Sequence, residues 1–272
     1  MLDYYTLNSP EAITLKNGVK IRPIFIKDID KITYPVYTSY VGCLLLSPTQ
    51  YFNTIEEKED YFSAYPESEK NIILQLKKEC ETSDNLKNTL TIFELIEVDS
   101  ILRNTFTNAF SFFFEDNIAY SKKHNMFIIY QINLENEDLI PIGQINKDNY
   151  EYIIDIILQL QGIERSIGDR GQCKTKNSIA LEIFNKIKKG REINSKPNPS
   201  DKRMELGNII SAVSSRHPSI NIINIRDMTV YQVYDQFKRL QLIDLNNMQS
   251  TSVSIWGDKK NSFKNDIWYQ NI

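Results

Sequence analysis

The chain has 272 residues, of which 41% are hydrophobic and 25% charged, values typical of a globular protein that buries its own core. At roughly 100–200 residues per domain, this length allows one large domain or two smaller ones. With 32 Lys and Arg against 35 Asp and Glu, the net charge is −3, which excludes a globally basic nucleic-acid coat and an acidic solvating tail.

The first clear pattern, residues 12–26, predicts a β-hairpin. Apolar and polar residues alternate on both sides of Asn17-Gly18, and this dipeptide favours a type I′ turn because both residues tolerate positive φ. Pro23 lacks a backbone donor, which predicts that the second strand lies at an edge or a bulge.

Helices are expected through most of the remaining chain, because apolar residues recur there at spacings of three and four. A strand is expected over 126–132, and Pro141-Ile-Gly-Gln144 is expected in a turn. The predicted helices are a short one from Asp28 that breaks at Tyr34-Pro35, a turn or two over 56–65, one from Pro66 through Cys80, and others over 90–114, 149–161 and 176–189. Gly162 is expected to end the helix at 149–161.

The C-terminal part begins after a Pro-, Asn- and Ser-rich linker at 194–200, which divides the chain into regions 1–193 and 201–272. Asp201 is expected to cap a helix that ends near Pro218. Thr229 and Gln232 have the spacing of a capping box, which predicts a second helix. The Asn- and Ser-rich residues beyond Asp244 are expected to form a tail. The predicted fold class is α+β, predominantly helical with a small N-terminal β-hairpin.

Cysteines and histidines are too few and too scattered for the common catalytic and metal sites. Cys43, Cys80 and Cys173 form no CxxC pair, which predicts three reduced thiols. His124 and His217 are the only histidines, and neither stands in a pattern typical of a nucleophile, base or metal ligand. We therefore expect no enzymatic activity, and no catalytic, cofactor-binding or metal-binding residue.

Two weaker motifs leave an enzyme that acts on DNA as the alternative. Residues 168–175 have the spacing of a phosphate-binding loop, but Cys173 stands where the second glycine belongs. Glu56-Glu57-Lys58, with Asp28 and Asp30 upstream, contains the ExK triplet of metal-dependent nucleases. Such a triplet is also typical of an exposed charged helix.

Charge is unevenly distributed along the chain. Residues 170–203 contain ten Lys or Arg against three Asp or Glu, a net charge of +7, which leaves −10 on the remainder. A basic segment of this kind fits phosphates or an acidic protein partner. It lacks the interleaved aromatic residues that stack on bases, so nucleic acid is the less favoured partner.

No segment is typical of a membrane protein or of secretion. The N-terminus has no basic stretch followed by an apolar one, so no signal peptide is expected. The longest apolar runs, 41–46 and 153–158, fall short of the roughly 20 residues of a membrane span. No membrane partner is expected, and the protein is predicted to be cytosolic or part of a soluble assembly.

Two segments resemble morphogenesis proteins of tailed bacteriophages, particularly tail or baseplate assembly chaperones. One is residues 13–32, and the other combines 206–215 with 228–240, which contains Thr-Val-Tyr-Gln-Val-Tyr-Asp-Gln-Phe-Lys-Arg-Leu. The resemblance implies other tail or baseplate proteins as partners, with assembly in the host cytoplasm. Because those chaperones are often shorter, a structural subunit retained in the virion stays open, as does a homo-oligomer.

A protein of this class needs surfaces that complement a partner rather than a nucleophile. Amphipathic aromatic side chains suit such surfaces, since one end is apolar and the other polar. The predicted partner-binding residues lie in the C-terminal region and are Tyr231, Tyr234, Phe237, Trp256 and Trp268.

Overall fold

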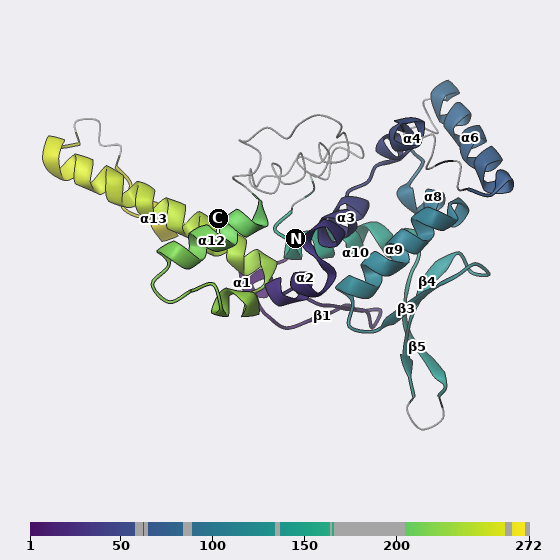
Figure 1. Ribbon diagram of the computed structural model, residues 1–272, viewed down its shortest axis with the longest axis horizontal. Helices are drawn as coiled ribbons and strands as arrows, with labels where there is room; N and C mark the ends of the chain where they lie inside the picture. The colour runs from purple at the N-terminus through teal and green to yellow at the C-terminus, as the bar shows by residue number, and fades with distance from the viewer. Residues whose placement is uncertain are drawn as a thin grey trace.

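The described part of the protein is largely helical, with two small antiparallel sheets (Figure 1). The predicted α+β class with a small N-terminal β element is therefore confirmed. The computed structural model describes residues 1–57, 62, 65–83, 89–133, 137–163, 165, 205–258 and 263–269.

The predicted linker at 194–200 and the predicted helix at 176–189 lie outside the described residues, so the division of the chain at the linker stays a prediction. Among the described residues, apolar side chains from both sides of that position belong to one hydrophobic core. The C-terminal helices therefore share a core with the N-terminal part.

The N-terminal hairpin forms where it was predicted, with a different turn. After the short helix α1 (Tyr4–Asn8), strands β1 (Ile13–Thr14) and β2 (Lys20–Ile21) pair antiparallel. At the turn Gly18 has a φ of 82°, whereas Asn17 does not have a positive φ. The expected type I′ turn is therefore wrong, and the loop is the three-residue kind that ends in a left-handed glycine.

Gly18 is also required by a close contact with the second sheet. A Cβ atom there would lie 2.3 Å from the backbone oxygen of Ile142. The Asn17 side-chain amide donates to the backbone oxygen of Gln144 at 3.2 Å. The hairpin turn thus covers part of one edge of the second sheet.

Helix α2 (Ile26–Ile32) is followed directly by α3 (Tyr34–Leu44), so the predicted break at Tyr34-Pro35 is confirmed. The break lies at Thr33, whose φ of 74° is uncommon for a β-branched residue. Pro35 lies in the first turn of α3, where its missing N–H costs no helical hydrogen bond.

The predicted helix at 90–114 is two helices. Helix α8 (Ile92–Val98) ends at Asp99, whose side chain accepts the backbone N–H of Leu102 at 2.8 Å and so caps α9 (Ser100–Phe113). Apolar periodicity continues across the break, which is why the pattern predicted one helix. Among the described residues, α4 (Pro48–Glu57) and the predicted α6 (Glu67–Thr82) precede this pair.

The second sheet has the order β3-β4-β5, and one of its strands differs from the sequence prediction. Strands β3 (Asn117–Ser121) and β4 (Met126–Ile132) pair antiparallel, and β4 is the predicted strand. The turn expected at Pro141 is instead part of β5 (Leu139–Ile145), an edge strand with a register shift opposite Ile129 and Tyr130. A proline is compatible with an edge strand beside a bulge.

The core lies between the second sheet and the helices α8, α9 and α10 (Lys147–Leu160). Its centre is aromatic: the rings of Phe110 and Phe127 meet edge to face, 5.0 Å apart at 85°. Tyr150 of α10 contacts Phe93 and Phe106. Helix α10 ends at the predicted Gly162, which has a φ of 73°.

The C-terminal part contains α12 (Leu206–Arg216), the 3-10 helices η2 (Asn224–Asp227) and η3 (Ile267–Tyr269), and the long helix α13 (Val230–Trp256). The predicted capping box opens α13. The helix before Pro218 is confirmed, but it begins at Leu206 with Glu205 at its N-cap, and the predicted cap, Asp201, lies outside the described residues. The tail expected beyond Asp244 is wrong up to Trp256, because α13 continues through it. In Figure 1 the far half of α13 extends away from the rest of the protein.

Candidate interaction surface

The start of α13 is fixed by its capping box. The hydroxyl of Thr229 accepts the backbone N–H of Gln232 at 3.2 Å, and the Gln232 side chain accepts the N–H of Thr229 at 2.9 Å. The Gln232 amide also donates to the backbone oxygen of Asn8 at 2.7 Å, which ties α13 to α1. These bonds satisfy donors that a helix start leaves open.

Backbone pairing joins the same point to the N-terminal part of the chain. Phe25 and Thr229 form an antiparallel bridge, with Val230 N–H donating to Ile24 O at 2.8 Å and Ile26 N–H to Met228 O at 3.0 Å. The start of α13 is therefore held both to the end of α1 and to the segment that opens α2.

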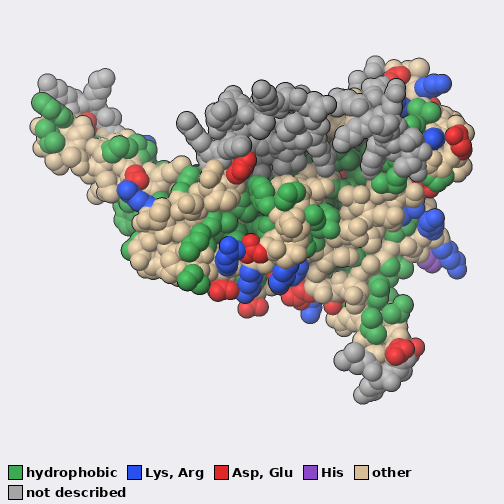
Figure 2. Space-filling model, viewed as in Figure 1, with side chains coloured by type: hydrophobic (Ala, Val, Ile, Leu, Met, Phe, Trp, Pro, Cys, Tyr) green, Lys and Arg blue, Asp and Glu red, His purple; other side chains and the backbone are tan. Residues whose placement is uncertain are grey.

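Ion pairs between α2 and η2 lie beside this junction. Lys27 pairs with Asp227 at 2.8 Å, and Arg226 pairs with Asp30. Figure 2 shows blue and red side chains interleaved over these elements. Because all four side chains are about half exposed or more, the pairs stabilise the junction only slightly.

The structure separates the five predicted partner-binding residues into two groups. Tyr234 is 8% exposed and lies in the core, with Tyr231 and Phe237 partly buried against it. Trp256 is 77% exposed and Trp268 is 45% exposed. Of the five, only the two tryptophans are exposed to solvent: Trp256 over most of its surface and Trp268 over nearly half of it.

The far half of α13 exposes further apolar side chains, in the segment that the Asn- and Ser-rich composition predicted to be a tail. Met248 and Ile255 are each 65% exposed. With Leu245 and Ser252 they follow the 3-4-3 spacing of one helix face, and this spacing was the signal that could have revealed them. Figure 2 shows hydrophobic side chains at the projecting end of this helix.

Helix η3 packs against α13 and brings Trp268 near it. Arg239 of α13 donates to the backbone oxygen of Trp268 at 2.9 Å. The rings of Trp268 and Tyr269 meet edge to face with centroids 5.0 Å apart. One side of α13 is therefore partly covered by η3, whereas Met248, Ile255 and Trp256 stay exposed.

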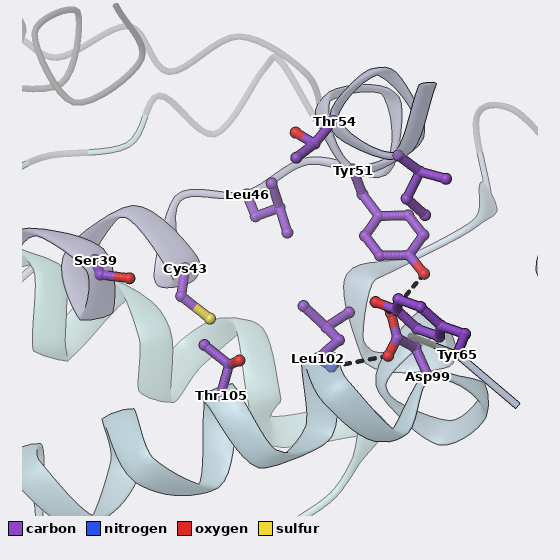
Figure 3. Close-up of a pocket in the computed structure, with 10 residues that line it drawn as sticks. Ser39, Cys43, Leu46, Tyr51, Thr54, Tyr65, Asp99, Leu102 and Thr105 are labelled. Carbon is purple, nitrogen blue, oxygen red and sulfur yellow. Dashed lines mark hydrogen bonds between the residues drawn. The ribbon is translucent and has the colours of Figure 1, made fainter. Parts of the chain in front are cut away.

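A pocket of about 250 Å³ lies between α3, α4 and α9. Figure 3 shows Ser39, Cys43 and Thr105 around one end, and Tyr51 and Asp99 at the other. Asp99 is completely buried, and its Oδ2 accepts the hydroxyl of Tyr51 at 2.6 Å and that of Tyr65 at 2.9 Å.

The other Asp99 oxygen caps α9, so both carboxylate oxygens are bound by donors of the protein itself. Such a carboxylate positions helices α4 and α9 against each other. The arrangement explains how the pocket is held together.

The histidines occupy turns. His124 lies in the exposed turn between β3 and β4. His217 follows α12, and its Nδ1 accepts the backbone N–H groups of Ser219 and Ile220, both at 3.1 Å. His217 thus orders the chain after α12.

Most residues of the motifs that suggested an enzyme acting on DNA lie outside the described residues. Residues 168–175, the basic segment 170–203 and Lys58 are not among the described residues, nor are the side chains of Glu56 and Glu57. Asp28 is paired with Lys31, and Asp30 is paired with Arg226. Within the described ranges, no group of three or more His, Cys, Asp or Glu could hold a metal ion, and no helix is long and apolar enough to cross a membrane.

Burial raises the pKa of five described tyrosines, Tyr34, Tyr37, Tyr120, Tyr150 and Tyr234, and three of them lie in the core. Loss of hydration raises the pKa of Tyr37, Tyr150 and Tyr234, because each hydroxyl is removed from water. The Tyr37 hydroxyl donates to the Gln161 side chain at 2.8 Å. These raised pKa values reflect burial in the core. An activated nucleophile would instead have a lowered pKa.

These observations describe a helix-rich protein whose long C-terminal helix presents apolar side chains to solvent. A family model described as the YomV second domain matches residues 195–272, which include all of α12 and α13. That family is phage-derived, so the match supports a phage origin for this chain. No curated protein and no solved structure matches the chain.

Proposed function

We propose that this protein is a non-enzymatic morphogenesis protein of a tailed phage, either a tail or baseplate subunit or an assembly chaperone. It acts through protein–protein contacts in the host cytoplasm during assembly, and as a subunit it would remain in the virion. Its partners are other tail or baseplate proteins.

The observation that carries the proposal is the exposed far half of α13, within the segment that matches the phage-derived family. Met248, Ile255 and Trp256 together expose two aliphatic side chains and an indole on one projecting element. Clustered exposed apolar side chains are typical of contact surfaces, and tryptophan is enriched where binding energy concentrates.

Three described acidic groups, Asp99, Asp28 and Asp30, have structural partners, which also favours a contact role. Asp99 caps α9, and Asp28 and Asp30 are paired with basic side chains. A nuclease would need such carboxylates available to a metal ion.

Affinity capture of the full-length protein from infected cells, followed by mass spectrometry, tests the proposal. We expect tail or baseplate proteins to co-purify with the wild type, and their recovery to fall about tenfold with Trp256→Ala, since a truncated anchor costs about 1–2 kcal/mol of binding. Tyr152→Ala is the matched control, because Tyr152 is a 62% exposed aromatic residue on α10. Equal recovery with both variants would contradict the assigned surface.

Purified virions distinguish the two forms of the proposal, because a subunit is present in them and a chaperone is absent. The enzyme alternative is tested in parallel by incubating the protein with DNA and a divalent metal ion. Cleavage that disappears in Glu56→Ala, with no tail protein captured, would overturn the proposal.

A further inference from the structure

The exposed face of α13 has an internal symmetry. Met248 and Ile255 lie seven residues apart, almost two helical turns, so their side chains leave the helix on the same side. Between them lie Thr251 and Ser252, which are exposed and small. We call these four residues the far stripe: a large apolar side chain at each end and two small ones at its centre.

We propose that the far stripe binds the far stripe of a second copy of this chain, with the two α13 helices antiparallel. In this arrangement Met248 of each copy lies against Ile255 of the other, and the small residues meet at the twofold axis. Such an interface is self-complementary, because each contact occurs twice. Small central residues let the helices approach closely, while the apolar ends supply the buried area.

Charge favours this occupant. From Leu245 to Gly257 the helix and its end contain no Asp, Glu, Lys, Arg or His. A charged partner would find no opposite charge along this stretch. A second copy brings no like charge against it, and its own apolar and hydroxyl side chains match the far stripe.

Position and area agree with a pair of copies. The far half of α13 extends beyond the rest of the described protein, so two helices can lie side by side there (Figure 1). Trp256, 77% exposed, borders the far stripe. Because an aromatic side chain buries roughly 150–250 Å², two tryptophans with four aliphatic side chains approach the roughly 1,000 Å² of a specific interface.

This inference rests on the proposed function, in which α13 is a contact surface, and it names one partner of that surface. The two can fail separately, because self-association is measured with the purified full-length protein alone. Capture of tail proteins requires infected cells.

Light scattering coupled to size exclusion is the main measurement. We expect a dimer at about 100 μM, a concentration that saturates a micromolar contact. Ile255→Glu places a charge in the interface of each copy and should raise Kd about 100-fold. Ser254→Glu is the matched control: its neighbouring, exposed position points to a different side of α13, and it should dimerise like the wild type.

Circular dichroism must show equal helix content in both variants, so that a monomer reflects a lost contact. A wild type that stays monomeric at this concentration overturns the inference. So does an Ile255→Glu variant that dimerises as well as Ser254→Glu.

Orientation is tested by disulfide formation between single-cysteine additions. Mixing Met248→Cys with Ile255→Cys should give a mixed disulfide dimer faster than either variant alone, with the wild type measuring the background from its own three cysteines. Faster pairing of Met248→Cys with itself would indicate parallel helices and overturn the antiparallel arrangement.

Discussion

The two halves of α13 belong to one continuous helix, but they are stabilised differently. The near half, which includes Val230, Val233 and Tyr234, is buried in the shared core and fixed by the capping box. The far half reaches Trp256 with Met248 and Ile255 exposed. The helix is thus continuous, whereas the burial of its side chains ends after the near half.

The far half remains helical because it continues a helix that the near half has already nucleated, and its hydroxyl side chains have partners on the helix itself. The hydroxyls of Ser250 and Thr251 donate to the backbone oxygen of Asn247, and that of Ser254 donates to Ser250 O at 2.8 Å. These side chains satisfy their polar groups on the helix itself. A helix already nucleated at Thr229 can therefore extend through residues with modest helix propensity. The near half stabilises the fold, and the far half is left available for contact.

The largest expected difference between the halves is in stability. Tyr234→Ala should lower the free energy of unfolding by about 3–5 kcal/mol, because it leaves a cavity in the core where the ring now packs. Trp256→Ala should change it by less than about 0.5 kcal/mol, since the indole is mostly exposed. Urea unfolding of both variants measures this contrast. Equal losses would mean that the far half contributes to the core.

The second expected difference appears at high pH. Because burial raises the pKa of Tyr234 in the folded state, the unfolded chain loses that proton first, near its ordinary value of about 10. Stability is therefore unaffected by this group below about pH 10 and falls as the pH rises further, by up to about 1.4 kcal/mol per pH unit.

Tyr234→Phe removes the ionisable hydroxyl and keeps the ring, so its stability should fall less steeply above pH 10 than that of the wild type. Urea unfolding at several pH values measures the slopes. Tyr269→Phe is the control variant, because it removes the hydroxyl of a tyrosine that is 61% exposed and lies outside the core. Parallel curves for wild type and Tyr234→Phe would show that this hydroxyl is hydrated.

The elements that the sequence predicted well have local causes. Gly162 ends α10, and Thr229 and Gln232 open α13, because caps are made by residues close together in the chain. The hairpin at 12–26 also follows from local alternation. Its turn was mispredicted because Asn-Gly fits a three-residue loop as well as a two-residue one.

The errors have tertiary causes. The break between α8 and α9 depends on Asp99 meeting Tyr51 and Tyr65, which are far from it in the chain. Pro141 lies in a strand because β5 is an edge. Neither condition is visible in a window of neighbouring residues.

The candidate surface was predicted in part for a related reason. Trp256 and Trp268 were singled out by residue type, and their exposure agrees with a role in contact, which stays a prediction. Tyr234 was chosen by the same criterion, but its place on the buried side of α13 depends on how the helix packs. Met248 and Ile255 were missed because Asn- and Ser-rich composition was interpreted as a tail.

The smallest expected difference in the free energy of unfolding is between loss of a hydroxyl at the start of α13 and loss of one near its end. Thr229→Ala should lower the free energy of unfolding by about 1 kcal/mol, because the backbone N–H of Gln232 loses its acceptor. Ser254→Ala should change it by a few tenths of a kcal/mol or raise it slightly, since alanine has the higher helix propensity. Thr229→Ser keeps the hydroxyl and should recover most of the loss. If Thr229→Ala and Ser254→Ala unfold at the same urea concentration, the capping box adds nothing, and the near half is held by core packing and its pairing with Ile24 and Ile26 alone.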